Sequence, residues 1–440
     1  MSPMARTATG STTEDRYAQL TTASRALWER ALGSLPGGNT RTTIFHDPYP
    51  VYLVRGEGCR VTDVDGVERI DFINNYTSLV LGHCHPRVVE AVRRQAGRLM
   101  SAAGPNELEV EMAERIRERL PSIELIRFAN SGTEATMLAI RAARAFTGRT
   151  TVATFAGAYH GTHDYAASIP ATAAGAPGGL GIPGSVADSI VVAPFNDPET
   201  TRAVLEPHLG DLAAVIVEPV MGAAGVLPAE ERFLPFLREL TDEAGALLVF
   251  DEVISFRIGY HGAQGRYGVT PDLTTLGKII GGGLPVGAFG GRADVMALFD
   301  PRHERRLGHG GTFNANPLSM AAGLATLAEL TPETFERLET LAVELKTKLE
   351  RLFAGVGVPA CVTQIGSLFN VHLTEGPVLD HSDALAADTA LLRELHLAML
   401  GCGILFTERG MGCLSAPMTG AEVDAFVEAA RQGLRELGIV

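Results

Sequence analysis

The sequence predicts an α/β fold, with a mostly parallel central sheet in a large domain and a smaller α+β domain. Between about residues 85 and 310, short segments that are apolar on both faces alternate with helical segments. This pattern is typical of parallel strands covered by helices on both sides. Beyond about residue 320, a helical region precedes short strands and a last helix. The length of 440 residues suits roughly two or three domains.

Seven segments are expected to form the large sheet, because each is short, aliphatic or β-branched, and bounded by turn residues. They are residues 124–130, 150–155, 189–194, 212–219, 245–253, 272–277 and 285–291. A helix follows the first of them. Ser131 and Glu134 have the spacing of a capping box, and Gly148 ends the helical repeat of apolar residues.

The segments outside the large sheet carry weaker signals. Residues 1–20 are polar and without periodicity, which predicts a loose tail. Asp65 and Gly66 mark a hairpin turn, and the Gly/Ala/Pro-rich residues 171–185 are typical of a mobile loop. Short strands are expected at residues 367–373 and 403–408, and a final helix near residues 421–436.

The charge balance excludes one large class of partners. Lys and Arg number 37 against 51 Asp and Glu, which gives a formal net charge of −14, so no nucleic-acid partner is expected. No apolar run is long enough to cross a membrane, and the first residues lack the apolar stretch of a secretory signal. We therefore expect a cytoplasmic protein without a membrane partner.

Lysine is rare, and one lysine has an unusual setting. Lys346 and Lys348 lie among glutamates on an amphipathic helix, whereas Lys278 lies in an apolar, glycine-rich segment. A buried lysine has a lowered pKa, and its neutral amine is nucleophilic toward carbonyl groups. The alternative is a structural lysine whose amine reaches solvent from a glycine loop.

Polar residues follow several of the predicted strands, where ligands bind in open α/β sheets. Ser131, Gly132 and Thr133 begin a helix, and the N–H groups of a helix start attract phosphate. An N-cap without a ligand is the alternative for this turn. Asp251 ends another predicted strand, where it could hold a protonated ring nitrogen or cap the next segment.

These pieces together match the needs of pyridoxal 5′-phosphate. That cofactor requires a lysine for a Schiff base, an acid at its pyridine nitrogen, a phosphate site and a partner for its ring face. Lys278, Asp251, the Ser131 turn and the Tyr159-His160 pair supply all four. No metal site is expected, because the histidine pairs lack carboxylates or cysteines at zinc-ligand spacing.

Longer motifs carry a family resemblance from about residue 30 to the C-terminus. NSGTEA (130–135), YHG (159–161), IVEPV (216–220), LTTLGKIIGGGLPVGAFGGR (273–292) and GTFNANPLSMAAGLATL (311–327) resemble the class III aminotransferases, which are fold-type I pyridoxal-phosphate enzymes. The resemblance implies a large cofactor-binding domain over residues 85–320. It assigns residues 21–84 and 321–440 to the small domain.

The resemblance also implies roles for individual residues. Lys278 would bind the cofactor covalently, with Asp251 at the pyridine nitrogen and Val253 and Tyr159 on the two ring faces. The remaining implied cofactor contacts are His160, Glu218 near the ring hydroxyl, and Ser131, Gly132 and Thr133 at the phosphate. Thr312 would reach the phosphate of the other subunit, which implies a homodimer with shared active sites.

Two subgroups of the family compete for the substrate assignment. INNYTS (73–78) resembles the β-amino-acid aminotransferases, whereas the loop at 171–185 resembles glutamate-1-semialdehyde 2,1-aminomutase, which usually carries a tryptophan near the position of Tyr76. Glu408 matches the aminomutases and Arg409 matches the aminotransferases. Arg41 matches a carboxylate-binding arginine of both, although each arginine could also be a plain surface residue.

We expect an aminotransferase that moves an amino group between a carboxylate-bearing amino acid and a 2-oxo acid by a ping-pong mechanism. Two arginines suit the carboxylates of two different acids, through bidentate hydrogen bonds. The alternatives are an intramolecular aminomutase and a non-catalytic regulatory or scaffold protein with this fold. The intact Lys278 argues against the non-catalytic alternative, since such a protein could easily lose that residue.

Overall fold

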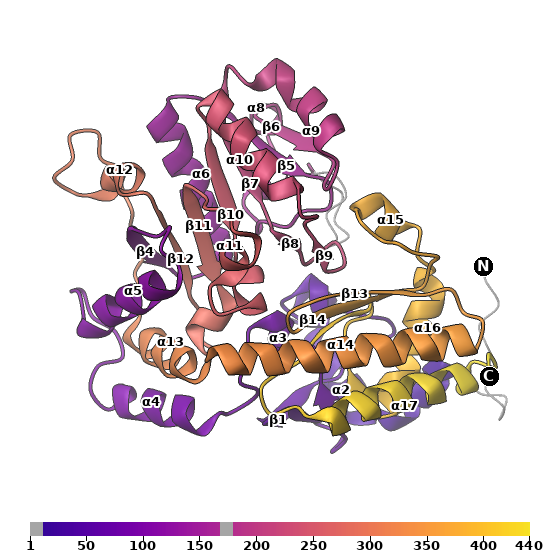
Figure 1. Cartoon of the computed structure of the whole chain (residues 1–440). Coiled ribbons are helices and arrows are strands. Elements are labelled where there is room, and N and C mark those ends of the chain that lie inside the picture. Colours follow the sequence, from indigo (N-terminus) through magenta and orange to yellow (C-terminus); the bar gives the residue numbers. More distant parts are fainter. Residues whose placement is uncertain (1–11, 168–178) are drawn as a thin grey trace. The chain divides into compact units, whose positions relative to one another are not determined.

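The computed structural model describes residues 12–167 and 179–440, and the chain divides into two compact units (Figure 1). Unit 1 comprises Met1–His85, Arg337–Val378 and Ser382–Val440, and unit 2 comprises Pro86–Glu336 and Leu379–His381. The boundary between the large domain and the C-terminal part of the small domain was expected at residue 320. In the structure, the corresponding boundary between the two units lies within α14 (Pro332–Gly355). The reason is that α13 (Pro317–Glu329) packs against α4 (Pro86–Ala96) and α5 (Glu107–Arg119) of unit 2.

The large sheet of unit 2 has seven strands in the order β4-β12-β11-β10-β7-β5-β6. Their bounds are β4 Leu125–Ala129, β5 Thr151–Phe155, β6 Ile190–Ala193, β7 Leu212–Val217, β10 Leu247–Asp251, β11 Leu273–Gly277 and β12 Gly287–Gly291. All seven predicted strands are confirmed. Only β12 runs antiparallel to its neighbours, β11 and β4, while the other paired strands are parallel.

Five of these strands are buried along their whole length, namely β5, β7, β10, β11 and β12. Burial on both faces is what the continuous apolar segments predicted, because a parallel sheet is covered on each side.

At the start of β12, the backbone passes very close to the Ser131 turn. A side chain at Gly287 would place its Cβ 2.0 Å from the carbonyl oxygen of Ser131, so only glycine fits there.

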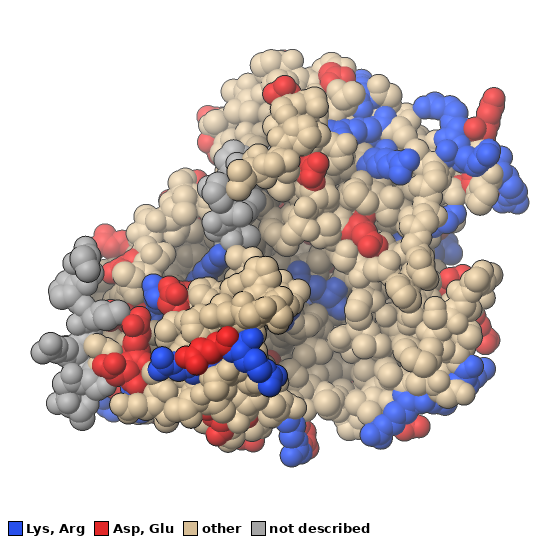
Figure 2. Space-filling model, turned by 180° about the vertical axis from the view of Figure 1, so that it is seen from behind, with Lys and Arg blue, Asp and Glu red and all other residues tan. Residues whose placement is uncertain are grey.

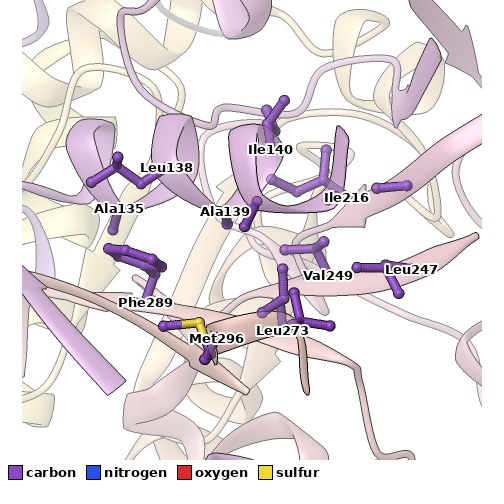
Figure 3. Packing of buried hydrophobic residues seen from close by; sticks show 14 of the residues in the cluster. Ala135, Leu138, Ala139, Ile140, Ile216, Leu247, Val249, Leu273, Phe289 and Met296 are labelled. Atoms are coloured by element: carbon purple, nitrogen blue, oxygen red, sulfur yellow. The ribbon is translucent and has the colours of Figure 1, made fainter. Parts of the chain in front are cut away.

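Helix α6 (Gly132–Thr147) covers one face of this sheet (Figure 3). Its Leu138, Ala139 and Ile140 belong to a buried cluster with Ile216 and Leu273 of the strands. Interiors packed this closely give little room for rearrangement. The helix start is therefore held in a fixed position at the edge of the sheet.

The start of α6 differs in one detail from the predicted capping box. The hydroxyl of Ser131 accepts a hydrogen bond from the Glu134 N–H at 3.2 Å, as expected. The Glu134 carboxylate, however, accepts from the N–H of Asn130 at 2.7 Å rather than from that of Ser131. The helix ends as predicted, because Gly148 adopts the left-handed conformation that glycine tolerates.

The other elements of unit 2 surround the sheet. The helices are α4 Pro86–Ala96, α5 Glu107–Arg119, α7 Asp164–Ala167, α8 Gly184–Ala187, α9 Pro198–Leu205, α10 Phe233–Ala244, α11 Gly262–Tyr267, α12 Ala293–Met296 and α13. A short hairpin joins β8 (Val220–Met221) to β9 (Leu227–Pro228). Most of the loop expected at 171–185 lies outside the described residues, and α8 includes its end.

Unit 1 contains two small sheets. One has the order β1-β2-β3-β15 (Leu53–Glu57, Arg60–Asp63, Glu68–Asp71, Ile404–Leu405) and the other β13-β14-β16 (Cys361–Ile365, Leu368–His372, Met411–Cys413). Its helices are α1 Thr13–Leu20, α2 Thr22–Ala31, α3 Asn74–Thr77, α16 Thr389–Gly401 and α17 Gly420–Glu436, with α14 and α15 (His381–Leu385) running in from unit 2. The predicted turn at Gly66 is confirmed, whereas the strand expected at 403–408 has only two residues.

The prediction of a loose tail over residues 1–20 is wrong for residues 13–20. These form α1, which starts with a capping box between Thr12 and Asp15. Tyr17 is buried, and its hydroxyl donates to the carbonyl of Tyr49 at 2.7 Å. A capped helix that buries an aromatic ring outweighs the polar composition of the segment. Residues 1–11 lie outside the described part.

Charged side chains of both signs are interspersed on the face shown in Figure 2. Among all the described residues, several exposed charged side chains form local pairs, such as Arg302 with Asp300 and Arg202 with Glu243. Exposed pairs of this kind contribute little to stability, typically below about 1 kcal/mol. Among the helices of the described residues, none has the length and apolar character needed to cross a membrane.

Candidate functional site

The structure places most of the predicted site residues of unit 2 at the carboxyl ends of strands. Asp251 is the last residue of β10. The segments that follow β4, β5, β7, β10 and β11 carry Ser131, Tyr159 with His160, Glu218, Val253 and Lys278. These ends meet at one edge, since β5, β7, β10 and β11 are neighbouring parallel strands. A parallel sheet places ligand-binding groups at that edge.

Asp251 is a buried carboxylate with three hydrogen-bonding partners. Its Oδ2 lies 2.7 Å from Nδ1 of His160, and its Oδ1 accepts from the Thr275 hydroxyl at 2.9 Å and the Val253 N–H at 3.2 Å. The far nitrogen of His160 lies 3.1 Å from the hydroxyl of Thr154. A buried carboxylate needs such partners, because it has lost its hydration. Its position is therefore tightly fixed.

Lys278 lies directly after β11, and its backbone adopts a left-handed conformation with φ of 49°. Burial lowers the pKa of its amine, while the charges of Asp251 and Glu218 act in the opposite direction. Lys346 and Lys348, in contrast, form ion pairs with Glu350 and with Glu344 and Asp424. Within the described residues, Lys278 is the lysine without an ion pair, as the sequence led us to expect.

Glu218 is a second buried acid at this edge. Its two oxygens accept from the N–H groups of Tyr159, at 2.8 Å, and Gly222, at 3.2 Å. Burial raises the pKa of Glu218 to about 7, and the negative charge of Asp251 adds to the effect. Burial also raises the pKa of the Tyr159 hydroxyl, again with help from these two carboxylates. Glu218 therefore fixes the backbone of the Tyr159 segment.

The Ser131 turn has the features of an anion site. The N–H groups of Gly132 and Thr133 lie in the first turn of α6, where they lack intrahelical acceptors. A Cβ at Gly132 would lie 3.0 Å from a methyl group of Val253, so the glycine allows Val253 to pack directly on the turn. The structure thus brings together the residues of the predicted phosphate site and one of the predicted ring contacts.

Thr312 lies in an exposed segment. Phe313 beside it is 59% exposed, which is unusual for a phenylalanine. The segment is tied back to the Ser131 turn by Asn314, whose side-chain oxygen accepts from the amide of Asn130 at 2.9 Å. Sequence reasoning missed this tether, although both asparagines stand inside the quoted family motifs.

The predicted substrate residues gather in unit 1 around Tyr76. Burial raises the pKa of the Tyr76 hydroxyl, and the charges of Arg409 and Arg41 lower it while that of Glu408 raises it. All three charged groups are thus close enough to act on one hydroxyl. Both arginines have exposed side chains. Tyr76 itself donates a hydrogen bond to the carbonyl of Thr43, two residues beyond Arg41.

The Glu408 carboxylate forms an ion pair with Arg393. Its Oε1 lies 3.5 Å from Nε of Arg393, and Arg393 also pairs with Asp47 at 2.8 Å. Burial raises the pKa of Glu408, while the charge of Arg393 lowers it. Sequence reasoning missed Arg393, because a single arginine on helix α16 carries no motif.

Tyr76 belongs to a turn with unusual backbone geometry. The four residues Asn74, Asn75, Tyr76 and Thr77 all have positive φ, between 48° and 72°. The left-handed conformation costs about 1–2 kcal/mol per non-glycine residue. Strain of this kind persists where surrounding contacts enforce it, and it concentrates at functional sites. The sequence analysis did not predict this turn; the Asn74-Asn75 pair could have signalled it, because asparagine tolerates this conformation best after glycine.

We expect Glu218 to make the stability of the cofactor-free protein pH-dependent. The folded protein keeps the proton of Glu218 up to about pH 7, whereas the unfolded chain releases it near pH 4.5. The contribution is therefore fully present below pH 4.5 and is lost as the pH rises through 7, by about 3 kcal/mol in all. Glu218→Gln should flatten the fall in unfolding free energy between pH 5 and 8, measured by urea denaturation.

Glu239→Gln is the matched control, because Glu239 is exposed on α10 of the same unit. It should follow the wild-type pH profile. An identical profile for Glu218→Gln would show that Glu218 does not bind its proton as inferred.

Known proteins of one family resemble this chain in sequence and fold. The family model for class III aminotransferases matches residues 44–418. A crystal structure of an omega-transaminase from Sphaerobacter thermophilus is 48% identical in sequence, with a TM-score of 0.91. The match covers 94% of this chain and 98% of the transaminase chain. The crystal structure of a β-phenylalanine aminotransferase from Variovorax paradoxus is 42% identical in sequence, with a TM-score of 0.89. The match covers 97% of this chain and 96% of that chain.

A curated glutamate-1-semialdehyde 2,1-aminomutase from Sorangium cellulosum is 44% identical over 425 residues, covering 94% of this chain and 96% of its own length. A transaminase with pyridoxal 5′-phosphate bound is also among the similar structures. The region that matches the family model spans most of the sequence and includes the predicted site residues except Arg41, which lies just before it. The chain belongs to the class III aminotransferases, the pyridoxal-phosphate enzymes of fold type I.

Proposed function

We propose that this protein is an intermolecular aminotransferase for a carboxylate-bearing amino acid of the β-phenylalanine kind, with a 2-oxo acid as the amino acceptor. Relatives named for β-phenylalanine and relatives named for glutamate-1-semialdehyde are similarly close, at 42% and 44% identity. Overall identity therefore does not choose between transfer to a second molecule and transfer within one molecule.

One observation supports the aminotransferase. Glu408, the residue that matches the aminomutases, is engaged by Arg393, whereas Arg41 and Arg409 are exposed near Tyr76. A ping-pong enzyme must bind the carboxylates of two different acids in turn, and arginine binds carboxylates through paired hydrogen bonds. An aminomutase keeps one substrate throughout and gains nothing from a second cationic partner.

The residues of unit 2 fit pyridoxal 5′-phosphate. The first-turn N–H groups of α6 suit its phosphate, and the buried Asp251 carboxylate suits a protonated pyridine nitrogen. Val253 and Tyr159 would flank the ring, and Glu218 would face its hydroxyl. The amine of Lys278 would bind the aldehyde carbon, since its lowered pKa favours the neutral nucleophile.

When bound, the cofactor supplies an aldehyde and an electron-withdrawing ring. The chain supplies the remaining functions. Asp251 holds the ring nitrogen in its protonated form, and His160, Thr275 and the Val253 N–H keep that carboxylate in place. Lys278, whose lowered pKa favours the neutral amine, would be the base that takes the proton from the substrate carbon bearing the amino group.

Lys278→Ala should abolish turnover while cofactor binding persists. The phosphate turn and Asp251 remain intact in this variant, but its general base is lost, so kcat should fall by at least about 100-fold. Lys346→Ala and Lys348→Ala should retain wild-type activity, because both residues lie on α14 in surface ion pairs. Borohydride reduction of the holoenzyme followed by peptide mapping should place the label on Lys278. A label on either of the other lysines would refute the assignment.

We further infer that the active unit is a homodimer in which Thr312 completes the phosphate site of the partner copy. The exposed Phe313 beside Thr312 supports this, since a large exposed apolar side chain marks a contact surface. Sedimentation velocity should show a dimer, and Phe313→Asp should weaken it and lower activity in parallel. A fully active wild-type monomer would contradict the proposal.

A substrate test separates the two amino-transfer reactions. β-Phenylalanine with pyruvate or 2-oxoglutarate should give the corresponding amino acid, alanine or glutamate, and Arg41→Ala should raise the KM for the amino donor by about 10-fold or more. Arg55→Ala is the matched control, because Arg55 is exposed and pairs only with Glu57 among the described residues. Conversion of glutamate-1-semialdehyde to 5-aminolevulinate without any 2-oxo acid, together with no transfer from β-phenylalanine, would establish the aminomutase instead.

A further inference from the structure

The left-handed turn at Asn74–Thr77 is held in place by groups that sequence reasoning did not identify. Asp71 is buried, and its Oδ1 accepts from the N–H groups of Ile73, at 2.8 Å, and Asn74, at 2.9 Å. Its Oδ2 lies 2.7 Å from Nε2 of His83. The side chain of Asn74 donates to the carbonyl of Cys413 at 3.0 Å. These contacts fix a backbone conformation that the chain would otherwise avoid.

The turn presents one side chain to a predicted substrate residue. Oδ1 of Asn75 accepts a hydrogen bond from Nη1 of Arg41 at 2.8 Å. The amide nitrogen of Asn75 donates to the Ser78 hydroxyl at 3.1 Å, so the amide oxygen is the atom that faces the guanidinium. The hydrogen bond from Tyr76 to the Thr43 carbonyl ties the same turn to the Arg41 segment a second time.

The chemistry of this contact differs from that of an ion pair. A guanidinium has five N–H donors, and an amide oxygen occupies one of them without neutralising the positive charge. The remaining donors keep the planar geometry that pairs with a carboxylate. An aspartate in place of Asn75 would hold Arg41 equally well but would compete with the substrate for its charge.

We propose that Asn75 is a positioning residue that orients Arg41 toward the substrate carboxylate and thereby sets the preference for carboxylate-bearing substrates. This inference rests on the proposed function, in which Arg41 binds that carboxylate. The strained turn explains why an asparagine stands here. The position requires both a left-handed backbone and a neutral hydrogen-bond acceptor.

The test compares Asn75→Gly, Asn75→Asp and Arg41→Ala holoenzymes by calorimetric titration with 3-phenylpropanoate, which is β-phenylalanine without its amino group. Glycine and aspartate both tolerate the left-handed backbone, so the variants should keep the wild-type melting temperature or exceed it. We expect about 10-fold weaker binding for Asn75→Gly and a larger loss for Asn75→Asp. In turnover, Asn75→Gly should raise the KM for β-phenylalanine, leave kcat nearly unchanged, and leave 1-phenylethylamine, an amine without a carboxylate, unaffected.

Cys84→Gly is the matched control for relief of backbone strain. Cys84 is exposed and also has a positive φ, of 50°, so the substitution eases the backbone without removing a contact to Arg41. It should bind 3-phenylpropanoate like the wild type.

The outcomes separate this inference from the proposed function. If Arg41→Ala binds 3-phenylpropanoate as tightly as the wild type, the carboxylate role of Arg41 is wrong and the inference falls with it. If Arg41→Ala loses affinity and Asn75→Gly does not, the role of Asn75 alone is wrong. Equal losses of Asn75→Gly toward 3-phenylpropanoate and 1-phenylethylamine would mean that Asn75 supports only the fold, which also overturns the proposal.

Discussion

The burial of one carboxylate, that of Asp251, is the constraint on which the cofactor-binding half of the molecule depends. Asp251 ends β10 in a buried environment, and an ionised carboxylate there is stable only with hydrogen-bond donors in place. The donors come from three places in the chain: the Thr275 hydroxyl of β11, the Val253 N–H and the His160 ring. The order of the parallel strands brings these segments together at one sheet edge.

The same low-dielectric environment acts on the two other ionisable groups at that edge. It raises the pKa of Glu218 and lowers that of Lys278, because burial disfavours the charged form of each. Their charges are coupled, since Asp251 and Glu218 both act on the lysine. Opposite shifts at neighbouring groups are typical of sites that move protons near neutral pH.

In unit 1, a strained backbone turn positions the predicted substrate residues, whereas in unit 2 burial and hydrogen bonds position the predicted cofactor residues. Four successive left-handed residues place Asn75 and Tyr76 against the segment that carries Arg41. The Asp71 carboxylate accepts hydrogen bonds from two N–H groups at the start of the turn, and His83 contacts the other oxygen of that carboxylate. Arg393 meanwhile engages Glu408, which leaves Arg409 as an exposed cation near Tyr76. A preorganised cation is the simplest way to bind a carboxylate with little loss of conformational entropy.

The sequence by itself determined the seven strands of the large sheet, the helix start at Ser131 and the singular position of Lys278, because periodicity, capping and burial preference are local properties. It also indicated the cofactor, since the four required chemical groups all follow predicted strands. It could not determine that α13 stays with unit 2, or that residues 13–20 form a helix whose Tyr17 is buried against Tyr49, because both outcomes depend on packing between distant segments. The hydrogen bond from the Asn130 N–H to the Glu134 carboxylate is local, but the choice of this N–H over that of Ser131 depends on the detailed backbone geometry of the helix start. The hydrogen bonds from Thr275 to Asp251 and from Arg41 to Asn75, and the ion pair between Arg393 and Glu408, were likewise decided only by the tertiary structure. Each joins residues from different elements, and a hydrogen bond or ion pair depends on distance and orientation that no local pattern encodes.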